Sequence, residues 1–149
     1  MASKELTADI QEIINNYGIK ARECFQNKDF EGFAKWQLEK WNAIPEPKEA
    51  WEESYRIAKL FIVFYIKHAV DFDQANVWLQ KLAWLDEKQQ QHPGELALMR
   101  GKMLFEKKEF AGAHESFSVA YRESKGHCFG TGDEVYLDFY RNPDKYMNS

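Results

Sequence analysis

The sequence predicts an all-α protein, an array of three antiparallel helical hairpins followed by a short C-terminal capping helix. Three observations lead to this class. Apolar residues recur at helical spacing, a pattern of small and aromatic residues occurs three times, and no segment alternates apolar and polar residues for long. With 149 residues, 44% of them hydrophobic, the chain is long enough to bury a core and fits a single domain, 1–149.

The third hairpin, over about residues 94–124, carries the clearest pattern. In "RGKMLFEKKEFAGAHESFSVAY", Gly101 is followed at helical spacing by Ala113, Phe117 and Ala120. Small residues let two helix backbones approach closely, and aromatic rings fill the space beside them. The stretch is therefore expected to form two antiparallel helices that face each other.

The same pattern occurs twice earlier in the chain. The second hairpin, about 48–90, shows it in Val63, Ala75, Leu79 and Leu82. The first hairpin, about 5–43, shows it in Ala21, Ala34, Leu38 and Trp41, with one extra residue at the corner. Each corner has an acidic residue before a Phe, in the pairs Asp29-Phe30, Asp71-Phe72 and Glu109-Phe110. An acid at the start of a helix favours the helix dipole, so each pair marks the start of a second helix.

These spacings resemble the tetratricopeptide (TPR) repeat, whose helix pairs show small, Ala, aromatic and Ala positions at such intervals. The third hairpin matches best. The other two depart from the pattern, with Val63 in place of a small residue and with Trp41 and Leu82 in place of the final Ala. The resemblance covers about residues 5–124 and implies stacked hairpins with a concave binding side.

Helix boundaries follow from the breaks in the chain. Pro45 and Pro47 separate the first two hairpins, and "QQHPGE" separates the second from the third. Thr131 and Glu134 have capping-box spacing, which predicts a C-terminal cap over about 131–141. The expected helices of the hairpins span about 5–26, 29–43, 48–68, 71–90, 94–107 and 110–124.

The first helix of each pair lines the concave side in a TPR-like stack. Here these helices supply the candidate partner-binding residues Arg22, Phe25, Phe61, Phe64, Leu98, Lys102 and Phe105. This set lacks the several Lys and Asn residues with which a carboxylate-clamp TPR holds a peptide C-terminus. The C-terminal segment offers an alternative occupant, since it is able to fold back into the groove.

An acidic stretch with a tryptophan, "EPKEAWEE", is the second candidate surface. Glu49, Trp51, Glu52 and Glu53 would face a basic partner, with the aromatic ring as an anchor. The alternative is a solvated helix start, where acids are common for a different reason.

No catalytic, metal or cofactor site is expected. His127 and Cys128 are the only adjacent His and Cys, and neighbours on a loop rarely orient a thiolate toward its own base, even if His114 joins them in space. The histidines lack metal-ligand spacing, and no glycine-rich phosphate-binding motif is present. The sequence therefore favours a non-enzymatic protein without metal or cofactor.

Charge and apolar runs limit the partners. A formal net charge of −4 gives no large cationic field for nucleic acid. The most apolar run, "LFIVFYI", is too short for a membrane span of about 20 residues. The start of the sequence does not read as a secretion signal, and the two cysteines match no redox motif. We therefore expect a cytoplasmic monomer or homodimer that binds a protein, not nucleic acid or membrane.

The ending "YRESKGHCFGTGDEVYLDFYR", with the small size and the single array, looks similar to bacterial immunity proteins encoded beside polymorphic toxins. That resemblance implies a protein that binds and occludes a cognate toxin domain, with a basic toxin domain as the candidate partner. The alternative is a general TPR-like adaptor or assembly factor.

Overall fold

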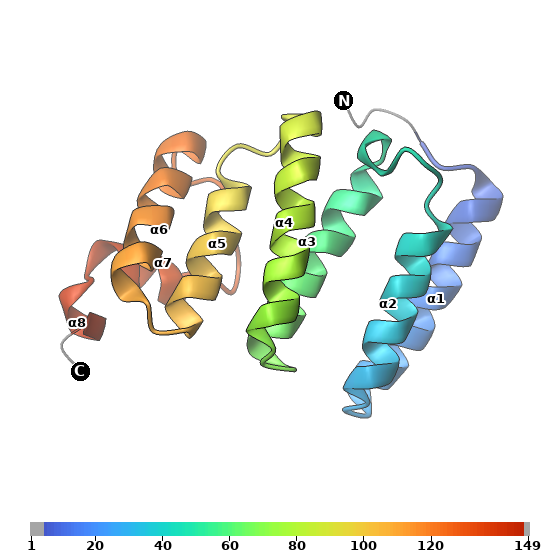
Figure 1. Cartoon of the computed structure of the whole chain (residues 1–149), viewed down its shortest axis with the longest axis horizontal. Helices are drawn as coiled ribbons and strands as arrows, with labels where there is room; N and C mark the ends of the chain where they lie inside the picture. The colour runs from blue at the N-terminus through green and yellow to red at the C-terminus, as the bar shows by residue number, and fades with distance from the viewer. Residues whose placement is uncertain (1–4, 148–149) are drawn as a thin grey trace.

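The computed structural model of the chain describes residues 5–147. Over this range the chain forms helices joined by short loops, with no strand, so the predicted all-α class is confirmed (Figure 1). None of the described helices is long and apolar enough to cross a membrane. The helices are α1 (Ala8–Gln26), α2 (Phe30–Ala43), the short 3-10 helix η1 (Lys48–Ala50), α3 (Glu52–Lys67), α4 (Phe72–Gln89), α5 (Glu95–Glu106), α6 (Phe110–Ser124), α7 (Glu134–Arg141) and α8 (Asp144–Met147).

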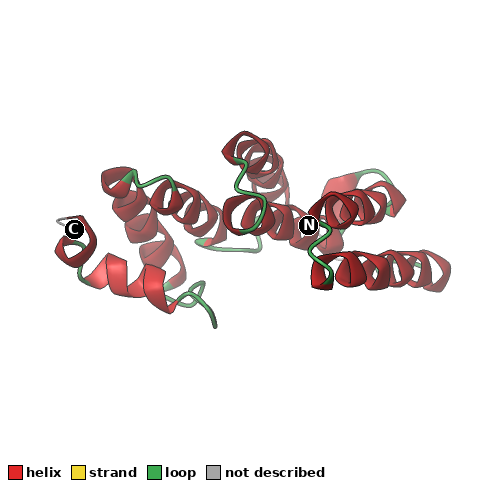
Figure 2. Ribbon diagram, turned by 90° about the horizontal axis from the view of Figure 1, so that it is seen from below, coloured by secondary structure: helices red, strands yellow, loops and turns green. Residues whose placement is uncertain are grey.

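Three antiparallel hairpins, α1/α2, α3/α4 and α5/α6, follow one another along the long axis of the molecule (Figure 1). Figure 2, turned by 90°, shows the same succession of helix pairs with short loops between them. In Figure 1 the hairpins run from α1/α2 on the right to α5/α6 on the left, where α7 and α8 complete the array. The helical hairpin array predicted from the sequence is therefore present.

Each hairpin turns at a corner of the same design. The acidic residue before each Phe is the N-cap of the second helix, at Asp29, Asp71 and Glu109. The carboxylates of Asp29 and Asp71 accept hydrogen bonds from the backbone N–H groups of Gly32 and Gln74, whereas Glu109 makes no such bond. The residue before each N-cap adopts left-handed backbone angles, at Lys28 (φ 58°), Val70 (φ 49°) and Lys108 (φ 65°). The repeat is thus one of backbone geometry as well as of sequence.

The extra corner residue lies in the second hairpin, not in the first as the sequence predicted. In the outer hairpins the N-cap N–H donates to the carbonyl five residues earlier, from Asp29 to Cys24 and from Glu109 to Leu104. In the middle hairpin it donates to the carbonyl six residues earlier, from Asp71 to Tyr65. All three hydrogen bonds measure 2.8 Å. Leu38, predicted as a core residue, is 44% exposed, while Phe33 and Gln37 are buried in its place. In α2, Ala34 and Leu38 fit the repeat pattern of the sequence, but each lies one residue after the position that is structurally equivalent in the other hairpins.

Counted from the N-caps, the second helices of the three hairpins align without insertion. The equivalent positions are Phe33, Ala75 and Ala113, then Gln37, Leu79 and Phe117, and then Lys40, Leu82 and Ala120. In α4 and α6 all of these residues are apolar and belong to the main core. In α2 two of the three are polar, which bears directly on the groove described below.

Helix α3 begins at Glu52, later than the predicted start at 48. After one 3-10 turn, Trp51 takes extended backbone angles (φ −124°, ψ 132°). Its indole N–H donates to the carbonyl of Pro45 over 2.8 Å, and its ring packs against the main core. Because Trp51 has extended backbone angles, regular helical hydrogen bonding starts only after it.

Helix α7 closes the third hairpin. Its Tyr136 and Phe139 are 2% and 0% exposed. Phe139 contacts Phe105 of α5 and Phe110 of α6, with ring centroids 5.1 and 5.7 Å apart. An end unit of a repeat array exposes an apolar face unless another element covers it, and α7 covers that face here.

The predicted capping box at the start of α7 is wrong. The N-cap is Asp133, and Thr131 lies outside the helix. The Asp133 carboxylate instead accepts the backbone N–H of Gly130 and pairs with the ammonium group of Lys102, both over 2.9 Å. Asp133 thereby ties the start of α7 to α5, a long-range bond that the local spacing does not reveal.

Candidate functional site

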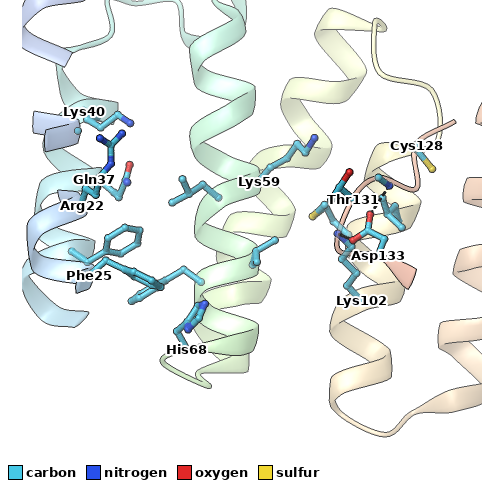
Figure 3. A pocket seen from close by; sticks show the side chains of 18 residues that line it. Arg22, Phe25, Gln37, Lys40, Lys59, His68, Lys102, Cys128, Thr131 and Asp133 are labelled. Carbon is cyan, nitrogen blue, oxygen red and sulfur yellow. Dashed lines mark hydrogen bonds and ion pairs between the residues drawn. The ribbon is translucent and has the colours of Figure 1, made fainter. Parts of the chain in front are cut away.

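A cavity of about 710 Å³ runs beside the first helices of the three hairpins; we call it the groove (Figure 3). Residues of α1, α2, α3 and α5 line it, together with the segment 128–133. Arg22, Val63 and Lys102 lie at equivalent places on their helices, two residues before the carbonyl that accepts the corner hydrogen bond. Gly18, Lys59 and Leu98 lie one helical turn earlier and line the groove as well. Because residues four apart share a helix face, each first helix presents one stripe to the groove.

Three phenylalanines form an apolar wall at the first-hairpin end of the groove. The ring of Phe33 lies 4.6 Å from that of Phe64 and 5.3 Å from that of Phe25, measured between centroids. Phe33 and Phe64 are buried, and with Ala21 they form a small core cluster apart from the main core. The His68 ring meets Phe25 edge-on at 4.8 Å. This cluster joins the first hairpin to α3.

Arg22, Gln37 and Lys40 lie together above this wall, on one side of the groove (Figure 3). The Lys40 ammonium group crosses to α1 at Gly18, where a Cβ atom would lie 3.8 Å from Nζ. Burial lowers the pKa of Lys40, and the charges of Arg22 and Arg56 lower that pKa further. None of the ion pairs formed by residues 5–147 includes Arg22, Lys40 or Arg56.

Gln37 is buried in the same place without satisfying its amide. Its side chain is 4% exposed, and its Oε1 has no hydrogen-bond partner in the described part of the chain. Leaving a buried amide group unpaired costs about 1–3 kcal/mol. Such groups are rare in folded proteins and call for an explanation.

The other cations of the groove are neutralised. Lys102 pairs with Asp133 over 2.9 Å, and both side chains are largely buried. Lys59 forms an ion pair with Glu95 of α5. Positive charge without a counterion is therefore concentrated at the first-hairpin end of the groove.

Five of the predicted partner-binding residues line the groove, namely Arg22, Phe25, Phe64, Leu98 and Lys102. Phe61 lies in the core instead, 2% exposed and stacked on Trp78 with ring centroids 4.1 Å apart. Phe105 packs under the C-terminal cap, 5.3 Å from Tyr136 between centroids. Both belong to first helices but lie off the stripe that faces the groove.

The acidic stretch around Trp51 lies elsewhere, at the junction of the second and third hairpins. Gln89 of α4 donates to the backbone carbonyls of Glu49 and Trp51 over 3.2 and 3.1 Å. The Glu52 carboxylate lies 3.4 Å from the His92 ring, and Glu53 is partly exposed. No residue of this stretch lines the groove. Its backbone is held by α4 of the same hairpin, a role that its composition did not indicate.

Sequence reasoning missed Gln37, Lys40 and Lys59. Lys59 lies on α3 one turn before Val63, a repeat position, and this spacing is the signal that finds it. The repeat pattern through Ala34 and Leu38 hides the other two because it lies one residue too late in α2. Counting from the N-cap at Asp29 places Gln37 and Lys40 at two positions that are apolar in the other hairpins. A polar residue at a core position of the repeat is the signal that identifies them.

Cys128 and His114, singled out earlier, each contact a backbone carbonyl oxygen. The Cys128 thiol lies 3.6 Å from the Ala120 carbonyl oxygen, and burial raises its pKa, the reverse of what an activated nucleophile needs. The His114 ring nitrogen lies 3.0 Å from the carbonyl oxygen of Tyr140. No group of three His, Cys, Asp or Glu side chains within residues 5–147 is placed to hold a metal ion.

Comparison of the chain with protein-family models, with curated proteins and with solved structures finds no match.

Proposed function

We propose that the chain is a non-enzymatic protein-binding module whose groove accepts a segment of a partner protein. The observation that carries this proposal is the groove itself, which draws its walls from all three hairpins and from segment 128–133. Hairpin arrays create extended concave surfaces of this kind, and proteins use them to bind other proteins. The mixture of aromatic and aliphatic walls with charged groups suits a peptide segment better than a polar metabolite.

The finer role follows the resemblance described above. We propose an immunity protein that binds and occludes a toxin domain, with a general adaptor or assembly factor as the alternative. The resemblance of the terminal segment supports the first role. The unpaired cations favour an acidic segment in the groove, so a basic toxin domain would have to meet the acidic stretch around Trp51 at the same time.

Site-specific photo-crosslinking in the source cells tests the protein-binding role. Leu60 lies on the groove and is 37% exposed, whereas Val77 of α4 lies away from it and is 45% exposed. A photo-reactive residue is placed at each position in turn. The proposal expects one discrete protein adduct from Leu60 and none from Val77. Equal labelling at the two positions, or none at either, contradicts it.

The crosslinked partner then separates the two finer roles. For an immunity protein, expression of the partner alone arrests growth, and co-expression of the wild-type chain restores it. For an adaptor, the partner is harmless alone but fails to assemble or function when the chain is deleted. Growth arrest that the chain does not relieve would contradict both.

A further inference from the structure

We infer that Arg22, Gln37 and Lys40 form a subsite for an Asp or Glu residue on an extended segment of the partner: Arg22 and Lys40 bind its side-chain carboxylate, and the Gln37 Oε1 accepts a backbone N–H of the segment. This inference rests on the proposed protein-binding function and names the chemistry of the partner. We call the three residues the carboxylate subsite.

Charge gives the first argument. The Lys40 ammonium group lies against Gly18, one helical turn from Arg22 on α1, and Figure 3 shows the side chains of Arg22 and Lys40 close together. Arg56 adds a third positive charge to their surroundings. Clustered like charges raise the free energy of the folded state, and a bound anion offsets that cost. Lys59 and Lys102, farther along the groove, already have carboxylate partners within the chain.

The position of Gln37 and Lys40 in the repeat gives the second argument. Their equivalents are Leu79 and Leu82 in α4, both buried in the main core. An apolar pair in α2 would allow the first hairpin to pack closely on α3. The polar pair instead lines an open groove, with the Gln37 amide facing it beside Arg22 and its Oε1 unpaired (Figure 3). Polar groups held at a packing position, without partners in the described chain, indicate a bound partner.

The walls of the groove give the third argument, which selects a peptide over a small anion. Leu60 and Val63 of α3 and Leu98 and Met99 of α5 also line the groove, and its volume of about 710 Å³ is far more than an inorganic anion fills. The ligand therefore carries an apolar body next to its charge. A glutamine amide both donates and accepts, which matches a peptide backbone better than phosphate oxygens. Arg22 suits a carboxylate because its guanidinium group forms paired hydrogen bonds with one.

Binding of short capped peptides to the full-length chain tests the subsite. The probes carry a central Glu flanked by all combinations of apolar residues, and each has a twin with Gln at the centre. Capped ends remove terminal charges, so only the side-chain carboxylate differs between twins. Because hydrogen bonds to charged groups contribute about 1.5–3 kcal/mol, the best Glu peptides should bind about tenfold or more tightly than their twins.

The variants Arg22→Gln and Lys40→Gln should each abolish the preference for Glu over Gln. Lys35→Gln is the matched control, because Lys35 is an exposed cation of α2 that lies over the Trp36 ring outside the groove. The control should keep the full preference. Thermal melts verify that each variant folds, and an NMR shift of the Gln37 side-chain amide should appear with Glu peptides but not with their twins.

Several results would overturn the subsite. These are the absence of any Glu preference across the peptides, a preference that survives both variants, and stronger competition by inorganic phosphate or a single-stranded RNA oligomer. Self-association of the chain that the peptides displace would assign the groove to a second copy. A protein adduct from Leu60 together with unchanged binding by Arg22→Gln and Lys40→Gln would refute the subsite alone and leave the protein-binding function standing.

Discussion

Lys40 shows at the residue scale how the proposed carboxylate subsite is held at the expense of stability. Its place in the repeat belongs to Leu82 in α4 and Ala120 in α6, both fully buried. In α2 a lysine occupies it, half-buried beside Arg22 and without a counterion in the described chain. Taking a charge out of water without pairing it is unfavourable, so the folded state tolerates the ammonium group but gains nothing from it.

We therefore predict that Lys40→Met stabilises the free protein by about 1 kcal/mol near neutral pH, because it replaces a partly buried, unpaired charge by an apolar chain of similar length. The folded-state pKa of Lys40 lies below its unfolded value, so between the two pKa values the unfolded chain binds more protons at this residue. In the wild type, the free-energy cost of the unpaired Lys40 charge is complete below the folded-state pKa. It disappears as the pH rises from the folded-state pKa to the unfolded-state pKa. The advantage of the variant should shrink accordingly toward about pH 10.4.

Denaturant unfolding of both proteins from neutral to alkaline pH measures this difference. Burial raises the pKa values of Tyr55 and Tyr136, so both proteins lose stability at high pH, but this loss is common to them and cancels. Lys35→Met serves as the control, since Lys35 is exposed and should show no such pH dependence. A stability difference between wild type and Lys40→Met that stays constant with pH would show that Lys40 is not desolvated.

At the scale of the element, α7 covers the apolar end of the third hairpin with a few aromatic side chains. Phe139 is fully buried among Phe105, Phe110 and Phe117, whereas Val135, in the first turn of the helix, is 53% exposed. The contribution of α7 to stability should therefore come from its buried side chains alone.

Phe139→Ala is predicted to destabilise the protein by about 3 kcal/mol or more, since it leaves a cavity among rings that cannot collapse. Val135→Ala should change stability by less than about 0.5 kcal/mol. Thermal or denaturant unfolding compares the two. Similar small effects from both substitutions would mean that α7 rests loosely on the hairpin and that the third hairpin is stable without it.

The sequence predicted elements well because their signals are local. Helical periodicity, the N-cap acids at Asp29 and Asp71 and the proline breaks all act within a few residues, and the structure confirms them. Features set by distant contacts were missed. Asp133 bonds Lys102 instead of forming a capping box with its neighbours. The register of α2 follows from its N-cap at Asp29, but Ala34 and Leu38 fit the repeat pattern one residue too late and conceal it. Of the groove, the sequence located the stripe of first helices but not the polar pair from α2.

At the scale of the whole molecule, the first hairpin is the unit most weakly tied to the others. Ile14 of α1 and Ile44 after α2 belong to the main core, but Ala21 and Phe33 form a small separate cluster with Phe64 of α3. The groove lies between α1/α2 and α3 and takes the place of apolar packing there. Local opening in proteins starts where few apolar contacts hold a segment.

Hydrogen exchange should therefore reveal a lower opening free energy in the first hairpin. The amide of Ala21 is predicted to exchange at least about tenfold faster than that of Ala58, relative to their intrinsic rates, although both residues are fully buried. Amides in the middle of α5 and α6 should resemble Ala58. Equal protection at Ala21 and Ala58 would indicate that the three hairpins open as one unit.

The polar pair of α2 has a consequence for the cooperativity of the array. In a one-dimensional repeat protein, stability is approximately a sum of unit energies and nearest-neighbour couplings, and Gln37 and Lys40 weaken the coupling at the first junction. A ligand that touches α1, α2 and α3 at once would supply that coupling from outside. At a concentration of about 100 times its Kd it would add about 2.7 kcal/mol to the first junction. The free chain would then unfold in two steps and the bound chain in one. The partner would thus replace the coupling energy that the first hairpin lacks with its neighbour.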